Sequence, residues 1–178
     1  MCSSHLVKLA YSTRFGTLTG YSLPFFRIRQ YADPITGRPN YGFVVDDNTT
    51  LFESGEGRRT EDYALRYKHS IGAFDIGLSG FKGTAREPQL LATGEFSANN
   101  GLPKLQAYHA YQTQVGLDVQ ATLGSWLWKL EASQTTQNRF IGDVVTLASP
   151  VMEIDVSRAT GGFEYTFYNL VNSGTDVG

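Results

Sequence analysis

The amino-acid sequence predicts an all-β fold, namely an antiparallel up-and-down sheet that closes into a barrel. Two observations predict it. Apolar and polar residues alternate with a period of two in several runs of up to about ten residues, which indicates strands and not helices. In addition, the connections between these runs are alternately short and long along the chain. No amphipathic helix is expected.

The clearest alternation covers residues 114–123. Its polar side carries Asp118 and Gln120, and its other side is entirely apolar: Val115, Leu117, Val119, Ala121 and Leu123. The pair Gly124-Ser125 then reads as a tight hairpin turn. Residues 126–133 repeat the pattern, with Trp126, Trp128 and Leu130 on one side and Lys129 and Glu131 on the other.

Further runs complete the expected sheet. Residues 5–11 and 16–22 predict a first hairpin, residues 63–68 and 74–79 a second, and residues 159–168 a later strand. A turn at 172–174 then leads into the start of another strand, so that about eight strands are expected in this chain. We expect one β-barrel domain over residues 1–178, truncated at both ends.

The connections between the predicted strands alternate between short turns and long polar segments. Short turns are expected near residues 13–15, 70–73, 124–125 and 170–174, and long polar segments near 30–61, 84–111 and 136–157. Outer-membrane barrels show this asymmetry, because their periplasmic turns are short and their extracellular loops are long. The sequence therefore favours a transmembrane barrel.

Alternation alone does not decide which face of the sheet is outside. Strands of about ten residues and aromatic residues near the turns favour lipid around the apolar face. The residues expected to face lipid are Leu65, Ile76, Leu78, Val115, Leu117, Val119, Trp126, Trp128, Leu130, Phe163, Tyr165 and Phe167. Those expected to line the lumen are Arg66, Lys68, Asp75, Asp118, Gln120, Lys129, Glu131 and Glu164.

Composition excludes several classes of protein. The chain has 15 Lys and Arg against 17 Asp and Glu, and this balance argues against a nucleic-acid-binding protein. Its single cysteine, Cys2, excludes an internal disulfide framework and a cysteine-based metal site. The acidic residues of the first long segment, including Glu53, lack the spacing of an EF-hand and predict a solvated loop. No cofactor and no metal are expected.

A catalytic site is weakly indicated. His109 lies in a long connection with Asp118 further along the chain, and such a pair could assist hydrolysis at the rim of a barrel. An ordinary strand-end histidine is the favoured interpretation, and no G-x-S-x-G motif is present. We therefore assign no catalytic residue and leave enzymatic activity open, with a non-enzymatic role favoured.

Five segments resemble stretches of uncharacterised porin-like outer-membrane proteins of Gram-negative bacteria. They are GTLTGYSLPFFR (16–27), GLSGFKGTAREP (77–88), QVGLDVQ (114–120), WLWKLEA (126–132) and GFEYT (162–166). The resemblance implies an outer-membrane location, with lipid and a small solute as partners. It also implies a fragment of a longer barrel, since such proteins begin with a signal peptide, which residues 1–4 do not resemble, and end in a strand that closes on an aromatic residue.

The leading functional expectation is a passive pore or transport channel of unknown substrate. The alternatives are a structural or adhesive barrel, a barrel hydrolase, and a soluble β-barrel that binds a ligand inside. The soluble alternative would require Val115, Leu117, Phe163 and Tyr165 to point into a core.

Overall fold

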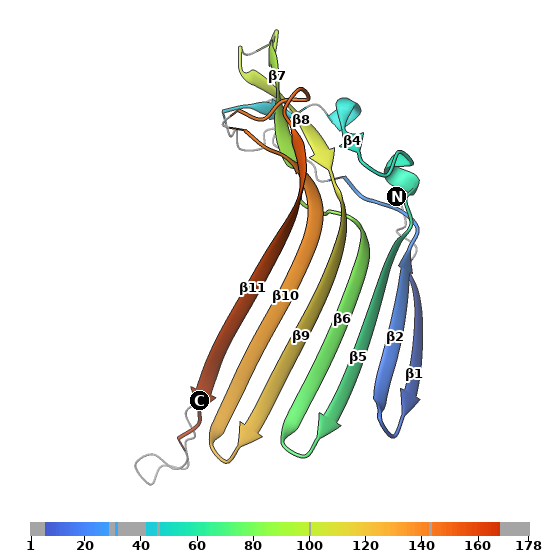
Figure 1. Cartoon of the computed structure of the whole chain (residues 1–178), viewed down its shortest axis with the longest axis vertical. Coiled ribbons are helices and arrows are strands. Elements are labelled where there is room, and N and C mark those ends of the chain that lie inside the picture. Colours follow the sequence, from blue (N-terminus) through green and yellow to red (C-terminus); the bar gives the residue numbers. More distant parts are fainter. Residues whose placement is uncertain are drawn as a thin grey trace.

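The computed structural model describes residues 6–28, 31, 42–45, 47–99, 101–142 and 144–167. Seven strands form one antiparallel sheet in the order β1-β2-β5-β6-β9-β10-β11. They are β1 (Val7–Thr13), β2 (Gly16–Leu23), β5 (Asp62–Ile71), β6 (Phe74–Thr84), β9 (Tyr111–Leu123), β10 (Trp126–Phe140) and β11 (Val151–Tyr165). Each strand lies beside the next one that joins this sheet along the chain (Figure 1). The predicted all-β, antiparallel class is confirmed.

The sheet is open. Within the described residues, β1 and β11 are its two edges, and neither pairs with the other. A closed barrel requires the first and last strands to share a ladder of hydrogen bonds, so the predicted ring is not formed by these seven strands. The turn and further strand expected after residue 170 lie outside the described residues.

One end of the sheet carries the predicted short turns. Strand β1 joins β2 through Arg14-Phe15, β5 joins β6 through Gly72-Ala73, and β9 joins β10 through Gly124-Ser125. Gly72 and Gly124 have φ values of 61° and 63°, which glycine adopts without the steric penalty of other residues. The three hairpin ends lie side by side in Figure 1.

The expected loop over residues 136–157 is wrong in its extent. Strands β10 and β11 each run for 15 residues, and only residues 141–150 connect them. Their ladder continues past the apolar alternation, for example where Thr136 pairs with Asp155. Polar residues dominate this stretch of β10, so the sequence shows no period of two, although the backbone hydrogen bonds persist.

The other end of the sheet carries a cap, which we define as the described parts of residues 24–61 together with 85–110 and 141–150. The long polar segments expected from the sequence contain short strands and 3-10 helices in the cap. They are β3 (Val44–Val45), η2 (Asp47–Thr49), β4 (Leu51–Phe52), η3 (Gly57–Arg59), β7 (Gln89–Phe96) and β8 (Pro103–His109). Strands β3 and β4 pair in parallel with β8, and β7 pairs with β8 in antiparallel fashion.

The cap holds most of the buried apolar core. Ala85, Leu91, Tyr108 and Ala110 form a buried cluster, against which Leu51, Phe140 and Val145 pack. Backbone hydrogen bonds tie the three connections together, from Ala92 to Val145 (2.7 Å) and from Glu53 to His109 (3.0 Å). In the described part of the chain, no helix has the length and apolar character to cross a membrane.

Candidate functional site

The strand register divides the main sheet into two faces of opposite chemistry. Residues directly opposite each other on neighbouring antiparallel strands point to the same side. One row joins Lys68, Gly77, Asp118, Glu131 and Thr160 across five strands. All eight residues expected to line a lumen fall on this side, which we call the polar face.

The opposite side, which we call the apolar face, carries the residues expected to face lipid. Its central row joins Tyr67, Leu78, Leu117, Ala132 and Ala159. The predicted residues in the ladders of β5 to β11 all lie on this face. Phe167 follows the end of β11, and its ring lies 4.7 Å from that of Tyr165.

The apolar face exposes large hydrophobic side chains. The relative accessibility of Leu65 is 52%, that of Val115 is 54% and that of Phe163 is 61%. On the polar face, the side chains of Arg66 and Asp118 are 33% and 40% exposed, and those of Lys129 and Glu164 are 46% and 63% exposed. Both faces are therefore open, and the exposure of large apolar side chains departs from the arrangement expected for a protein folded in water, where such side chains are covered first.

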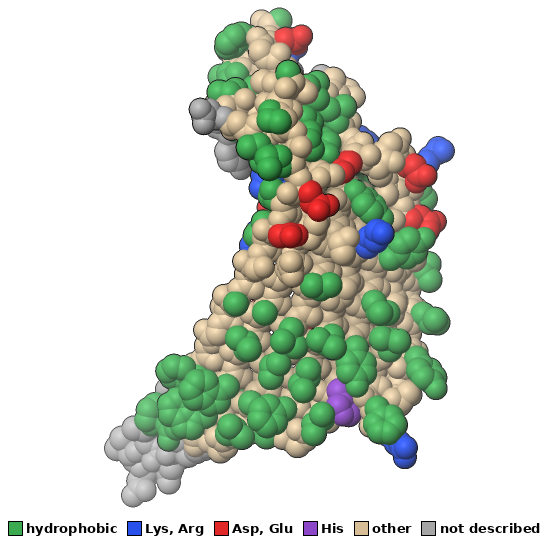
Figure 2. Space-filling view, viewed as in Figure 1, with side chains coloured by type: hydrophobic (Ala, Val, Ile, Leu, Met, Phe, Trp, Pro, Cys, Tyr) green, Lys and Arg blue, Asp and Glu red, His purple; other side chains and the backbone are tan. Residues whose placement is uncertain are grey.

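Charged and polar residues bound the apolar face near the cap. A row of Tyr63, Lys82, Thr113, Thr136 and Asp155 crosses the sheet there. Figure 2 shows hydrophobic side chains spread over the sheet toward the short turns, with charged groups gathered toward the cap. Along β9 the uniformly apolar stretch extends from Val115 to Leu123, about 26 Å at 3.3 Å per residue.

Aromatic rings gather at the short-turn end of the apolar face. Trp126 lies 4.7 Å from Tyr165 and 5.7 Å from Trp128, measured between ring centroids. Phe163 lies 5.3 Å from both tryptophans. We call these four residues and Phe167 the aromatic cluster. Tryptophan and tyrosine on an exposed sheet near strand ends are typical of the boundary between hydrocarbon and water.

Ion pairs bridge strands on the polar face. Arg66 reaches across β6 to Asp118, and its Nη2 donates to both carboxylate oxygens at 2.8 and 3.0 Å. Gly77 makes this possible, because a Cβ at that position would overlap the Asp118 carboxylate. Lys129 of β10 donates to Glu164 of β11 at 2.5 Å. Ser70 and Asp75 form a hydrogen bond beside the second short turn.

Other charged or polar side chains on the polar face lack such partners. The side chains of Lys68, Gln120 and Glu131 make no hydrogen bond or ion pair to any residue that the structure describes. Asp118 and Glu131 lie directly opposite on neighbouring strands, so their like charges disfavour each other. The face therefore carries both satisfied pairs and free charges.

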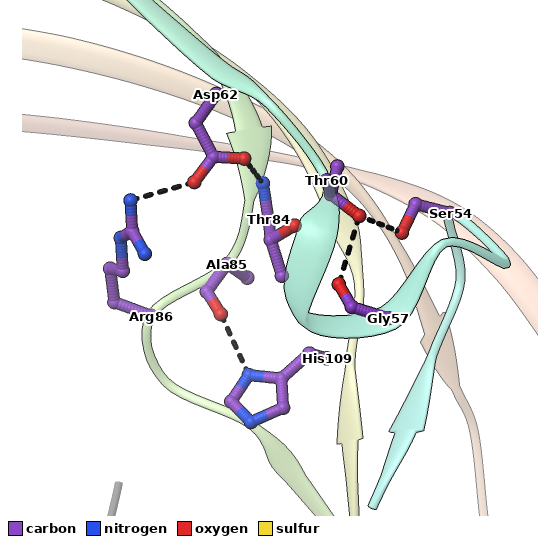
Figure 3. Close-up of polar contacts among 8 residues, drawn as sticks. All are labelled: Ser54, Gly57, Thr60, Asp62, Thr84, Ala85, Arg86 and His109. Carbon is purple, nitrogen blue, oxygen red and sulfur yellow. Dashed lines mark hydrogen bonds and ion pairs between the residues drawn. The ribbon is translucent and has the colours of Figure 1, made fainter. Parts of the chain in front are cut away.

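Residues of the cap contact the polar face at the end of the sheet opposite the short turns. Asp62 has the polar-face orientation, and its side chain is fully buried. It accepts hydrogen bonds from the Thr84 backbone N–H (2.7 Å) and from Arg86 (2.6 Å), as Figure 3 shows. The Arg86 guanidinium also lies over the ring of Phe26. These contacts cover that corner of the sheet.

His109 is buried in strand β8 and not exposed in a loop. Its Nδ1 donates to the Ala85 carbonyl at 2.8 Å (Figure 3), and its ring stacks on Phe52 and meets the edge of Phe26. Its Nε2 is buried and has no partner among the described residues. Burial lowers the pKa of His109, and the nearby positive charge of Arg86 lowers it further.

The geometry gives no support to a hydrolase site. Asp118 lies on the polar face and binds Arg66, so the structure does not bring it to His109. Among the described residues, the only polar contact of the His109 ring is with the backbone carbonyl of Ala85. Among the described residues there is also no cluster of histidine, cysteine or acidic side chains able to hold a metal ion.

Sequence reasoning missed the role of Glu53, which was expected in a solvated loop. Its carboxylate accepts hydrogen bonds from the Tyr111 backbone (2.7 Å) and from Asn138 (2.6 Å), at the cap ends of β9 and β10. Burial, with a contribution from Glu53, raises the pKa of Tyr108 to about 12. No sequence signal identifies these hydrogen bonds of Glu53, because the partners are 58 and 85 residues away in the chain.

Comparisons with protein-family models, with curated proteins and with solved structures give no match to this chain.

Proposed function

We propose that this chain is part of a transmembrane β-barrel of the bacterial outer-membrane type, and that its polar face lines a passage for small solutes. The observation that carries the proposal is the exposure of large hydrophobic side chains over a whole face of the sheet. Leaving a Val, Leu, Ile or Phe side chain in water forgoes about 1.5–3 kcal/mol of burial free energy. An entire exposed apolar face is therefore costly in water, and it is favourable in hydrocarbon.

The proposal requires both edges of the sheet to be paired in the membrane. An unpaired backbone N–H or C=O group costs several kcal/mol in hydrocarbon, so open sheet edges do not persist there. Strands β1 and β11 must then pair with further strands. The aromatic cluster supports the same location, since it would lie at the membrane boundary on the short-turn side.

A soluble ligand-binding barrel is disfavoured. It requires Val115, Leu117, Phe163 and Tyr165 to be covered by a core, whereas their relative accessibilities range from 37% to 61%. A structural barrel without transport remains the second candidate, and the ion pairs that bridge strands on the polar face favour it. The ionic conductance of the protein in a planar bilayer separates these two candidates.

The proposal is tested by comparing two adjacent positions on β9. In a Cys2→Ser background, Val119→Cys and Gln120→Cys are each labelled with a polarity-sensitive fluorophore after refolding into vesicles. We expect the label at 119 to be quenched by brominated lipid and the label at 120 by aqueous iodide. Equal quenching at both positions contradicts the proposal. Ala121 is unsuited to labelling because it is only 6% exposed.

A further inference from the structure

A hollow of about 500 Å³ lies on the polar face, over strands β5, β6, β9, β10 and β11. One row of the register runs through it, from Arg66 through Ser79, Gly116 and Ser133 to Arg158. Only the two ends of this row carry long side chains, which stand about 19 Å apart at 4.8 Å per strand. The hollow exists because the three middle residues are small.

The wall toward the short turns is acidic. Asp118 and Glu131 occupy the next row, and both line the hollow. Together with Arg66 and Arg158, they give it two positive and two negative charges, so its formal charge is zero. A site of this kind does not select for anions or for cations by net charge.

The ion pairing leaves one charge of each sign available. Arg66 is engaged with both oxygens of Asp118. The side chains of Glu131 and Arg158 have no hydrogen bond or ion pair to any described residue. They lie diagonally opposite on β10 and β11, since Glu131 faces Thr160 and Arg158 faces Ser133. Diagonal neighbours are about 7–8 Å apart, which leaves room for a small group between them.

We propose that this hollow binds a small zwitterionic solute of the α-amino-acid class. The Arg158 guanidinium receives the carboxylate, because Arg pairs well with planar anions. The Glu131 carboxylate receives the ammonium group, and Ser133, which is paired with Arg158, lies beside them. The hollow falls within the volume range of small-molecule sites, about 300–1,000 Å³. Its open shape gives weak, readily reversible binding, which a passage requires.

This inference rests on the proposed function only in making the site part of a passage. The test measures binding by the shifts of backbone amide resonances of Gly116 and Ser133 in the chain refolded into detergent micelles. Three probes are titrated, namely alanine, propionate (the same acid without the ammonium group) and ethylammonium (the same amine without the carboxylate). We expect saturable shifts with alanine, and at least tenfold weaker binding of the other two.

Variants locate the site. Arg158→Gln and Glu131→Gln are each expected to weaken alanine binding about tenfold or more, the loss from removing one charged partner. Lys129→Gln is the matched control, because Lys129 lies on the same face but outside the hollow. It is expected to leave alanine binding unchanged. A well-dispersed amide spectrum confirms that each variant is folded.

The inference is overturned if alanine binds no better than both half-molecules, or if neither variant weakens its binding. Failure of the proposed function is read separately, from the flotation of the same protein with vesicles in the absence of solute. A chain that inserts and does not discriminate alanine overturns the inference alone. A chain that discriminates alanine in micelles but does not insert overturns the membrane proposal, and the binding site stands without it.

Discussion

Gly77 shows how one missing side chain organises the polar face. It lies directly opposite Asp118, and the carboxylate of Asp118 extends over it toward Arg66 two strands away. The exposed ion pair itself contributes little to stability, about 0–1 kcal/mol. Any Cβ at Gly77 would occupy the space of the carboxylate, which would have to move away from Arg66.

Gly77→Ala is therefore expected to displace the Asp118 carboxylate and break its pair with Arg66, which lowers the free energy of unfolding by up to about 1 kcal/mol. Gly80→Ala on the same strand is the matched control, because a Cβ there meets no atom within 4 Å. It should change stability by less than about 0.5 kcal/mol. Urea unfolding of the refolded protein measures both, and equal effects would contradict the assigned role of Gly77.

Leu117 and Gln120 test the two faces at the level of single residues. Leu117→Arg places a charge on the apolar face, where it costs about 2–4 kcal/mol at the middle of a bilayer. We expect this variant to lose vesicle insertion, measured by flotation. Gln120→Arg puts the same charge on the polar face and is expected to insert normally. Comparable insertion of both variants would exclude lipid contact at Leu117.

At the scale of elements, the cap is held by contacts between distant segments. Glu53 joins it to the ends of β9 and β10, and Arg86 of the cap binds Asp62 of β5. The rings of His109, Phe26 and Phe52 contact one another within the cap. The Ala85 carbonyl can only accept a hydrogen bond, so Nδ1 of His109 carries the proton. The buried Nε2 is then the unprotonated nitrogen, and protonation would place a charge there without an acceptor.

The stability of the cap is therefore expected to fall on acidification. Burial lowers the pKa of His109 in the folded cap, whereas the unfolded segment keeps the ordinary value of about 6.5. As pH drops below 6.5, the unfolded form binds a proton that the folded form resists, and stability declines until pH passes the folded pKa. Protection factors of cap amides at pH 7.5 and 5 measure this change.

Two substitutions identify the titrating group. His109→Phe keeps an aromatic ring against Phe26 and Phe52, and it should make the protection of the cap amides independent of pH in this range. His69→Gln is the control, since His69 lies at the opposite end of the sheet on β5 and should leave the pH dependence unaltered. Persistence of the full pH effect in His109→Phe would assign it to another group.

At the scale of the whole molecule, the open edges decide how the sheet can exist in lipid. Strand β1 bonds to β2 on one side only, within the part of the chain that the structure describes. In water its outward backbone groups are satisfied by solvent, whereas hydrocarbon offers no partner. Membrane insertion must therefore be accompanied by new pairing along β1 and β11.

We expect hydrogen exchange to report this pairing. In detergent micelles, the amides of β1 that point away from β2 should exchange quickly, and after insertion into vesicles they should become as protected as those of β9. Amides of β9, which is paired on both sides, provide the internal reference. Fast exchange of β1 in vesicles would show that the edge remains in water.

The sequence by itself determined the strands of the main sheet wherever one face is apolar. Residues 114–123 alternate without exception, and residues 126–133 alternate with Leu127 as the one exception. The two-residue turn between the runs contains Gly124, whose φ of 63° suits such a turn. The assignment of Asp118 and Leu117 to opposite faces follows directly, because side chains in a strand alternate. The same signal failed at residues 134–139, where both faces of β10 are polar and no alternation exists to be detected.

Only the tertiary structure decided how the long connecting segments fold and which side chains contact each other. The cap, the hydrogen bonds of Glu53 and the burial of His109 depend on contacts between segments far apart in the chain. No local sequence pattern predicts such contacts. The pairing of Arg66 with Asp118, and hence the availability of Glu131 and Arg158, depends on register across several strands. Alternation fixes the side of the sheet on which a residue lies, whereas register and packing fix its neighbours.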